Sequence, residues 1–326
     1  GPFEVQGVAL DGEASIGVVM YPEDGADSAT LLQRGDVAMY RAKDRQVDYA
    51  RYSRTDDHHS PARLGLMAEL RGAIEGGQLV LHHQPKIDLV SGQVCGSEAL
   101  VRWEHPELGL LLPGAFVPLA ESTSMIRPLT SRVLAQALAD VSAWHENGLD
   151  IGVAVNVSAR CLLDPTFPAT VHDLLVGAGV GPARLSLELT ESAIMADPTT
   201  TASVLEELHA MGVVLSVDDF GTGYSSLAYL QQLPVEELKI DRSFVAAMAE
   251  ETSAVIVRST IDLGRNLGLR VVAEGVENDG ILAQLRELGC PVAQGFAISR
   301  PLAEPAFVDW VHQRGGGPAG SPKLVA

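Results

Sequence analysis

The sequence predicts an α/β protein, a TIM-like (β/α)8 barrel with an antiparallel first strand, preceded by a short α+β fragment. Along most of the chain, short apolar runs rich in β-formers alternate with longer helical patterns, which is typical of βα units. Eight such runs occur, and several end in a polar residue, as expected at the carboxyl-terminal rim of a barrel. The 326 residues suffice for one barrel of about 200–250 residues and a fragment.

The N-terminal head, residues 1–52, has the pattern of a small piece of a domain. A strand is expected over residues 14–20, a turn over 22–25 and a helix over 28–44. One strand and one helix bury too little apolar surface to be stable alone. The head should therefore belong to a domain that is truncated at its N-terminus, or it should pack on the rest of the chain.

The body, residues 62–314, follows a polar linker at 53–61 and is expected to contain the barrel. Its strands are expected at residues 80–84, 94–101, 152–156, 185–189, 213–217, 237–240, 270–273 and 292–295. Helices are expected at residues 130–147, 166–176, 199–211, 253–267 and 279–288, several of them with Pro, Asp, Thr or Ser at the start and Gly at the end. The Gly-rich residues 315–326 are expected to be a flexible tail.

The first two strands of the body should form an antiparallel hairpin. Only a short turn around residues 89–92 separates them, which leaves no room for a helical crossover. The barrel should therefore depart from regular (β/α)8 topology at its first strand.

The composition excludes some classes of partner. With 23 basic and 42 acidic residues the formal net charge is −19, so nucleic-acid polymers are not expected to bind, because their binding depends on Lys and Arg. Cys95, Cys161 and Cys290 form no disulfide or zinc pattern, which fits a reducing cytoplasm. No run of about 18 apolar residues is present, so no membrane segment is expected in this chain, although upstream segments could attach the full-length protein to a membrane.

Polar residues in or at the end of successive strands are candidates for a functional site. They are Glu98, Asn156, Glu188, Asp218, Asp219, Lys239, Glu274 and Gln294. Any one of them alone would more often be a satisfied core residue, but five carboxylates at one rim repel one another unless cations neutralise them. Oxygen ligands without Cys or His indicate Mg²⁺ or Mn²⁺, and adjacent Asp218 and Asp219 suit a pair of cations. Lys239 would orient a water or neutralise charge; its alternative is an ion pair with Asp241 or Glu237.

Seven motifs resemble, in order and spacing, those of the EAL-domain cyclic-di-GMP phosphodiesterases, over about residues 64–314. They are Ser-Glu-Ala-Leu-Val-Arg-Trp at 97–103, Asn-Val-Ser at 156–158, Glu-Leu-Thr-Glu-Ser at 188–192, Asp-Asp-Phe-Gly-Thr-Gly-Tyr-Ser-Ser-Leu at 218–227, Lys-Ile-Asp at 239–241, Ala-Glu-Gly-Val-Glu at 273–277 and Gln-Gly-Phe at 294–296. In the head, Ser-Ile-Gly-Val at 15–18 and Ala-Met-Tyr at 38–40 resemble the last third of a GGDEF diguanylate cyclase domain. The GGDEF signature itself is missing from this chain, so no cyclase activity is expected of it.

The resemblance implies a role for each candidate residue. The first cation would be held by Glu98, Asn156, Glu188 and Asp218, and the second by Asp218, Asp219 and Glu274. The catalytic residues would be Lys239, which positions the attacking water, together with Glu274 and Glu191, the last bracing the Gly-rich loop after Asp219 unless it is only a helix N-terminal acid. The substrate would be bound by Gln84, Arg102, Asp241, Glu277 and Gln294, of which Arg102 could instead form a surface pair with Glu104 and Glu277 could support Glu274. His83 stands where an aromatic residue is usual, and it is expected to be structural.

The function that the resemblance implies is metal-dependent hydrolysis of cyclic di-GMP to linear pGpG, which ends a second-messenger signal in bacteria. The alternative is a catalytically silent module that binds cyclic di-GMP as a receptor. A complete set of ligand residues favours the enzyme. A third interpretation, a structural scaffold tied to the head, explains none of the acids at the strand ends. The family resemblance also implies a homodimer.

Overall fold

The computed structural model describes residues 3–5, 8–10, 16–44, 48–53, 61–195, 197–221 and 230–314. The chain divides into two compact units, Gly1–Gly72 and Ala73–Ala326, and each is described by itself. Most of the expected linker, the Gly-rich residues 222–227 and the expected tail lie outside the described residues. The expected domain boundaries stay predictions.

The first unit contains a helix beside short strands. Its described strands are β1 (Phe3–Val5), β2 (Val8–Leu10), β3 (Ile16–Val18) and β4 (Tyr49–Arg51). The predicted helix over 28–44 is confirmed as α1 (Ser28–Asp44), which connects the parallel strands β3 and β4. Strand β4 was not predicted. Helix α2 (Pro61–Glu75) crosses the division between the units. The assignment of this unit to a GGDEF domain stays a prediction.

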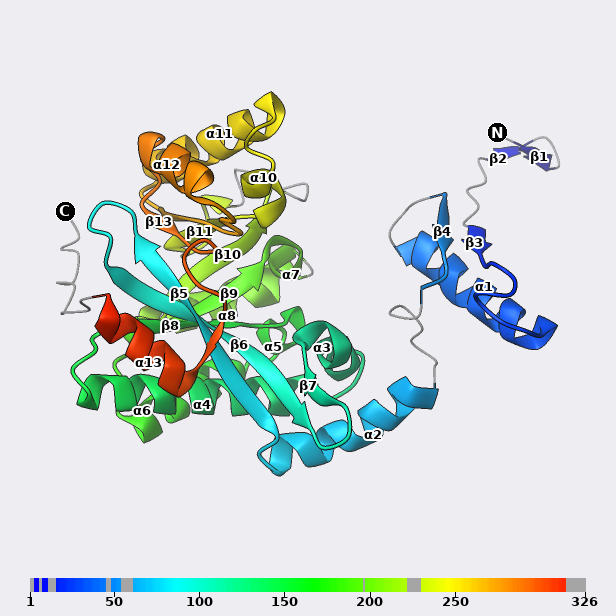
Figure 1. Ribbon diagram of the computed structural model, residues 1–326, viewed down its shortest axis with the longest axis horizontal. Helices are drawn as coiled ribbons and strands as arrows, with labels where there is room; N and C mark the ends of the chain where they lie inside the picture. The colour runs from blue at the N-terminus through cyan, green and yellow to red at the C-terminus, as the bar shows by residue number, and fades with distance from the viewer. Residues whose placement is uncertain are drawn as a thin grey trace. The chain divides into compact units, whose positions relative to one another are not determined.

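The second unit is a closed barrel of eight strands, which confirms the predicted fold (Figure 1). The strands are β5 (Leu79–Asp88), β6 (Val94–His105), β8 (Gly152–Asn156), β9 (Leu185–Thr190), β10 (Val214–Phe220), β11 (Glu237–Ile240), β12 (Arg270–Ala273) and β13 (Val292–Ala293). They pair in this order, and β13 pairs back with β5. Two short strands extend the sheet, β7 (Gly109–Leu111) beside β6 and β14 (Leu302–Ala303) beside β5.

Strand β5 is antiparallel to both of its neighbours in the barrel, β6 and β13. The predicted hairpin is therefore confirmed. The structure extends β5 to Asp88, beyond the predicted end at residue 84, and shortens β13, so that Gln294 follows the strand. Because β5 runs against the other strands, its residues lie progressively farther from the carboxyl-terminal rim along the chain.

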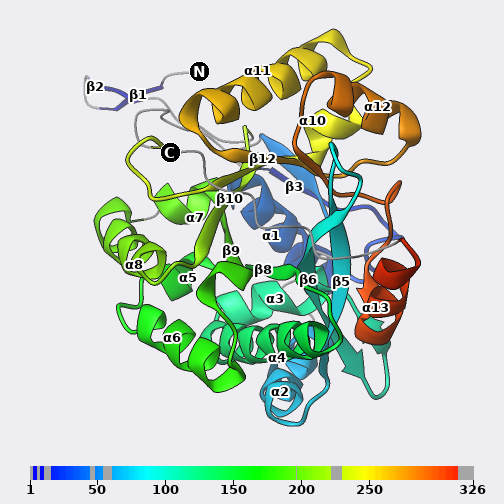
Figure 2. The same ribbon diagram turned by 90° about the vertical axis from the view of Figure 1, so that its left-hand side faces the viewer.

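Helices surround the strands, as Figure 2 shows for α4, α6, α8, α11, α12 and α13. The five predicted helices are confirmed, with ends shifted by a few residues, as α4 (Ile126–Glu146), α6 (Phe167–Ala178), α8 (Pro198–Ala210), α11 (Glu251–Leu267) and α12 (Asp279–Glu287). The sequence did not predict α3 (Pro113–Glu121), α5 (Ala159–Leu162), α7 (Glu191–Met195), α10 (Arg242–Ala246) and α13 (Glu304–Gln313).

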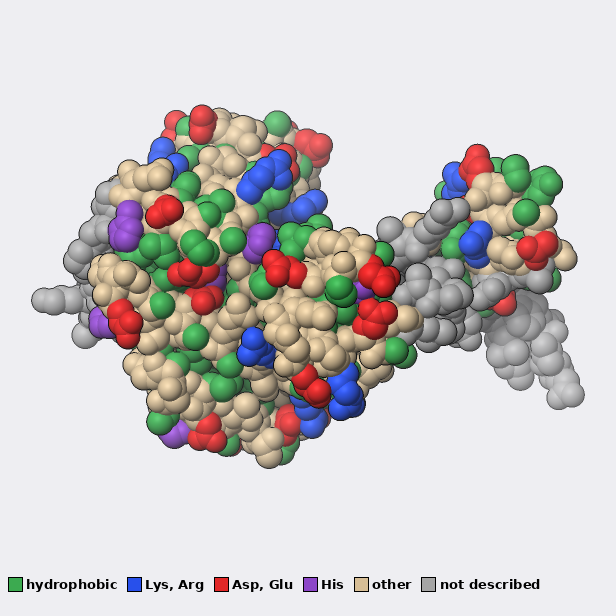
Figure 3. Space-filling model, turned by 60° about the horizontal axis from the view of Figure 1, so that its bottom comes forward, with side chains coloured by type: hydrophobic (Ala, Val, Ile, Leu, Met, Phe, Trp, Pro, Cys, Tyr) green, Lys and Arg blue, Asp and Glu red, His purple; other side chains and the backbone are tan. Residues whose placement is uncertain are grey.

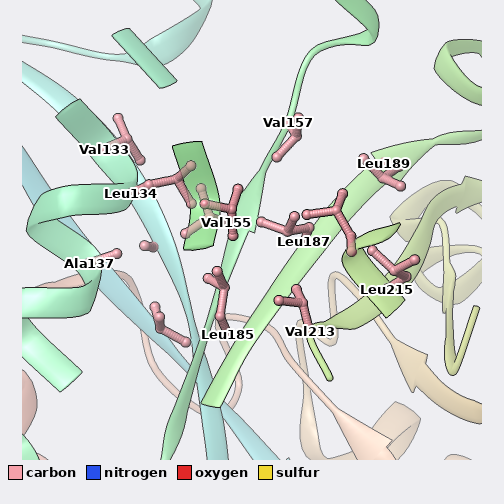
Figure 4. Packing of buried hydrophobic residues seen from close by; sticks show 14 of the residues in the cluster. Val133, Leu134, Ala137, Val155, Val157, Leu185, Leu187, Leu189, Val213 and Leu215 are labelled. Carbon is pink, nitrogen blue, oxygen red and sulfur yellow. The ribbon is translucent and has the colours of Figure 1, made fainter. Parts of the chain in front are cut away.

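The main apolar core lies between the strands and the helices. In β9, Leu185, Leu187 and Leu189 are fully buried in this core, where they pack with residues of the neighbouring strands and of α4 (Figure 4). Side chains alternate between the two faces of a strand. The residues between these leucines, among them Glu188, therefore point into the barrel, and this alternation places polar groups inside it.

The surface carries charges of both signs. On the face shown in Figure 3, acidic side chains are scattered among uncharged ones rather than gathered in one patch. Across the described residues, no helix is both long and apolar enough to cross a membrane.

Candidate active site

The fully buried Lys239 side chain lies at the centre of a cluster of carboxylates inside the barrel. Its Nζ atom donates to Glu188 Oε2 at 2.6 Å and to Asp218 Oδ2 at 3.0 Å. Glu274 Oε1 lies 2.6 Å from the same atom. The four residues come from β11, β9 and β10 and from the residue after β12, so the barrel brings together distant parts of the sequence. Lys239 therefore contacts acids in or directly after the adjacent strands β10 and β12 and in β9, and not acids of its own strand.

A network of amide groups holds Glu98 beside this cluster. Asn156 Nδ2 donates to Glu98 Oε1 at 2.7 Å, and Gln294 Nε2 donates to Glu98 Oε2 at 2.5 Å. Gln294 Nε2 also donates to Gln84 Oε1 at 3.1 Å, and Gln84 Nε2 donates to the backbone oxygen of Ser299 at 3.0 Å. Gln294 Oε1 is buried and has no hydrogen-bond partner among the described residues, so it is an acceptor available to a ligand.

A bulge at the end of β10 places both Asp218 and Asp219 near the cluster. The pairing with β11 shifts register between Val217 and Phe220, and Asp219 has a φ of 54°. In a regular strand two successive side chains point to opposite faces, whereas a bulge redirects one of them. Burial, together with the nearby charges of Asp218 and Asp241, raises the pKa of Asp219 to about 6.

Lys86 is a site residue that the sequence analysis missed. It lies on β5, it is buried, and its Nζ atom donates to Glu188 Oε1 at 2.7 Å. Burial alone would raise the pKa of Glu188, but the charges of Lys239 and Lys86 and their hydrogen bonds lower it to about 2. The available signal was a lysine two residues after Gln84, in a strand whose alternate side chains point into the barrel.

The other two acids of the cluster, Glu98 and Glu274, are held away from full ionisation by burial and by the neighbouring carboxylates. Burial raises the pKa of Glu98, and it raises the pKa of Glu274 to about 8, in both cases against the opposing effect of Lys239. Among the residues that the structure describes, no three Asp, Glu, His or Cys side chains are spaced as a ready-made metal site. The donor set still fits a hard divalent cation, because it consists of carboxylate and amide oxygens whose charge one lysine does not neutralise.

The other residues that were predicted to bind the substrate have different surroundings. Arg102 is buried on β6, donates to the backbone oxygen of Val101 at 2.9 Å, and is near enough to Glu98 for that charge to affect its pKa. Asp241 caps α10 by accepting a hydrogen bond from Ser243 N at 3.0 Å. Glu277 is exposed, and the described structure gives it no bond to the cluster.

Glu191, the first residue of α7, is buried, and its Oε2 atom has no partner within the described part of the chain. The loop that it was predicted to brace falls at residues 222–229, outside the described residues. Its bracing role therefore stays a prediction.

His83, which faces the helices outside the barrel, is part of the core and not of this site. Its Nε2 atom is 2.9 Å from Asp140 Oδ2, and its ring packs against Trp144 at 4.7 Å and Phe307 at 5.5 Å between centroids. The expected structural role of His83 is confirmed.

Replacing Gly295 by alanine is expected to destabilise the site. A Cβ atom at Gly295 would lie 2.2 Å from Val276 N and 2.3 Å from Val276 O, so the segment that carries Gln294 would have to move. We expect the free energy of unfolding to fall by about 1–3 kcal/mol, as for other overpacked positions. Chemical denaturation measures this loss.

The matched control is Gly177→Ala in α6, where an added Cβ would meet no atom within 4 Å. This variant should be neutral or stabilised by about 0.5–1 kcal/mol, because alanine is the better helix former. Equal stability of the two variants would contradict the close packing at Gly295.

The raised pKa of Glu274 predicts that stability depends on pH. The folded protein holds a proton on Glu274 up to about pH 8, whereas an ordinary glutamate releases it near 4.5. Because the folded state then binds more protons than the unfolded chain, the free energy of unfolding should fall as pH rises from about 4.5 to about 8. Glu188 acts in the opposite sense, since its contribution is lost as pH falls from about 4.5 to about 2.

Thermal denaturation after chelator treatment checks this prediction, with Glu274→Gln as the control that removes the titrating group. The melting temperature of the unaltered protein should fall across the upper range, and that of the variant should fall less. Identical slopes for the two proteins would argue against protonation of Glu274. Added Mg²⁺ or Mn²⁺ should raise the melting temperature more at the high-pH end.

The barrel and its interior define the class of protein: an α/β barrel with one antiparallel strand and an acidic, lysine-centred cluster of side chains built from its strands. Within this class, the chain belongs to the EAL domain family, whose profile matches residues 67–301.

Curated relatives share the sequence over most of this chain. MucR of Pseudomonas aeruginosa, named a bifunctional diguanylate cyclase/cyclic di-GMP phosphodiesterase, is 42% identical over 304 residues, covering 92% of this chain and 44% of MucR. NbdA of the same organism, named a cyclic di-GMP phosphodiesterase, is 41% identical over 312 residues, covering 93% of this chain and 40% of NbdA. The chain thus spans less than half the length of these relatives.

Solved structures share the fold. The phosphodiesterase PaMucR, in a complex with c-di-GMP, is 44% identical and superposes with a TM-score of 0.72, covering 74% of this chain and 99% of that one. The EAL domain of DcpA from Mycobacterium smegmatis is 36% identical with a TM-score of 0.62, at the same two coverages of 74% and 99%.

Proposed function

We propose that this chain hydrolyses one phosphodiester bond of cyclic di-GMP to give linear pGpG, with two Mg²⁺ or Mn²⁺ ions at the carboxylate cluster. The observation that carries the proposal is the convergence of Glu188, Asp218 and Glu274 on the buried Lys239, with Glu98 held beside them. The proposal is also supported by membership of the EAL family and by relatives that are named cyclic di-GMP phosphodiesterases.

The residues proposed to hold the cations are those at the strand ends. They are Glu98, Asn156, Glu188, Asp218, Asp219 and Glu274. When bound, the cations would supply positive charge to the phosphate oxygens and lower the pKa of an attacking water. The buried carboxylates would then no longer repel one another, because the cations neutralise their charge.

The reaction adds water across one P–O bond. The oxygen of water forms a bond to phosphorus, the bond from phosphorus to the ribose 3′-oxygen breaks, and that oxygen takes up a proton. Lys239 would orient the water and stabilise the charge that develops on the phosphoryl oxygens. Gln84, Gln294 and Arg102 would hold the dinucleotide, with Arg102 as a planar donor to its acceptor groups.

Incubating the purified chain with cyclic di-GMP and Mg²⁺ or Mn²⁺ should release pGpG, which chromatography with mass detection identifies. A chelator should stop the release, and added Mn²⁺ should restore it. Binding of cyclic di-GMP by a folded, metal-supplied sample without any turnover would contradict the proposal and would support the receptor alternative instead.

We also propose that the chain acts as a homodimer in the cytoplasm. The family resemblance supports the dimer, and the three cysteines, which are all free, fit a reducing compartment. Light scattering of the purified chain tests the dimer, which a monomeric mass at all concentrations would contradict.

A further inference from the structure

A second charged layer lies inside the barrel, beyond the cluster around Lys239. Lys86 Nζ is 2.7 Å from Glu188 Oε1 and 3.3 Å from Glu237 Oε1, and Ser216 Oγ donates to Glu237 Oε1 at 3.2 Å. Lys86, Glu237 and Ser216 are all buried. Of these three residues only Lys86 has a described hydrogen bond to the cluster around Lys239, through Glu188.

The strand directions explain why this layer is deeper. On β5, Lys86 comes two residues after Gln84, and because β5 is antiparallel this step leads away from the carboxyl-terminal rim. On β11, Glu237 comes two residues before Lys239, which leads in the same direction. Residues from strands three places apart around the barrel thus meet one layer farther from the carboxyl-terminal rim than the cluster.

Glu188 joins the two layers, because each of its carboxylate oxygens has a lysine partner. Oε1 accepts from Lys86 and Oε2 accepts from Lys239 at 2.6 Å. The terminal torsion of a glutamate is broad, so a carboxylate held through one oxygen keeps rotational freedom. A second donor on the other oxygen removes that freedom and fixes the plane of the carboxylate.

We propose that Lys86 is a positioning residue. It holds Glu188 through Oε1, on the side away from the carboxyl-terminal rim, so that Oε2 faces the proposed cation site. The inference rests on the proposed function, in which Glu188 is a metal ligand. When a residue that hydrogen-bonds to a metal ligand and orients it is lost, metal affinity or activity typically falls. Glu237 has a different role, since it balances the charge of Lys86 and makes no contact with the ligand residues among the described bonds.

Three variants separate positioning from a merely structural role. Lys86→Met removes both contacts and leaves Glu237 as a buried, unpaired charge. Glu237→Gln also breaks the Lys86–Glu237 ion pair, but it leaves the hydrogen bond between Lys86 and Glu188 in place. The double variant Lys86→Met/Glu237→Gln removes the ion pair without leaving that carboxylate charged, so it should recover much of the lost stability.

Each variant is measured in three ways: melting temperature, Mn²⁺ binding by electron paramagnetic resonance, and turnover of cyclic di-GMP. We expect Lys86→Met to weaken Mn²⁺ binding and kcat by about 10–100-fold, with KM for the dinucleotide changed little. Glu237→Gln should keep both properties close to those of the unaltered protein. The double variant should melt near the unaltered protein and yet retain the loss in Mn²⁺ binding and kcat.

Recovery of both stability and Mn²⁺ binding in the double variant would overturn the proposal, as would equal losses in Lys86→Met and Glu237→Gln. If Lys86→Met alone fails to fold, the double variant is compared with Glu237→Gln instead. Failure of the double variant to fold would show that Lys86 is needed for the fold itself, and this too would overturn the proposal. The Mn²⁺ measurement needs no turnover. Absence of hydrolysis by the unaltered protein would therefore count against the proposed function and leave the positioning role to be judged from metal binding.

Discussion

Replacing Lys239 by methionine is expected to lower the free energy of unfolding by about 3–5 kcal/mol and to abolish turnover of cyclic di-GMP. The Lys239 ammonium is fully buried and contacts Glu188, Asp218 and Glu274. Removing one partner of a buried ion pair leaves uncompensated charge in a medium of low polarity, and here Glu188 and Asp218 lose the same partner, as does the carboxyl group of Glu274. Turnover is lost because no other described lysine contacts Asp218 or Glu274.

Chemical denaturation and a pGpG release assay measure the two effects. Arg265→Met is the matched control, since Arg265 pairs with Asp262 on the surface, with 59% of its side chain exposed. That change should cost no more than about 1 kcal/mol and leave turnover intact. The destabilisation of Lys239→Met should also shrink as pH is lowered, because the carboxylates can then take up protons. A fully stable Lys239→Met protein would contradict the central position of this lysine.

Replacing Asp218 by alanine is expected to reduce turnover by on the order of 10³-fold or more, the size of effect seen when a charge-stabilising group is removed. Stability should change by no more than about 1 kcal/mol. The reason is that Asp218 contributes to raising the pKa values of Asp219 and Glu274, so its loss relieves repulsion as well as removing a contact. Lys239 keeps its contacts with Glu188 and Glu274 in this variant.

The same assay and a melting curve test this separation of activity from stability. Asp262→Ala, which removes an acid from an exposed position on α11, should retain turnover. Turnover by Asp218→Ala at the rate of the unaltered protein would rule out a role for Asp218 in the reaction. A large loss of stability would show instead that Asp218 is needed mainly to balance the charge of Lys239.

The sequence predicted the barrel, and it singled out most residues of the buried cluster, because both depend on local pattern. Apolar runs of strand length marked each of the eight strands, and the four-residue turn between the first two strands predicted their antiparallel pairing. Glu188, Lys239 and Asp218 were recognisable because a charged residue in an apolar strand has few reasons to be there. The short helices α5, α7 and α10 were missed because four or five residues give no helical periodicity.

The contacts across the barrel were not predictable from local pattern. Lys86 stands beyond the predicted end of its strand, and only the extension of β5 to Asp88 shows that it points inside. The bulge that redirects Asp219 depends on pairing with β11, which local sequence does not encode. Which carboxylate contacts Lys239 is likewise decided by register between strands far apart in the chain.

The antiparallel strand β5 also affects the order in which the barrel can form. β5 pairs with β13 through Ile87 and Ala293 and through Asp88 and Val292. The first barrel strand to be synthesised therefore cannot complete its pairing until the last one has been synthesised. Contacts between residues so distant in sequence slow folding, because a long loop must close before they form. Gln294 bonds to Gln84 and Glu98 directly after this closure strand. The amide network around Glu98 is therefore completed only when synthesis has passed the end of β13, and until then the nascent barrel has an open edge.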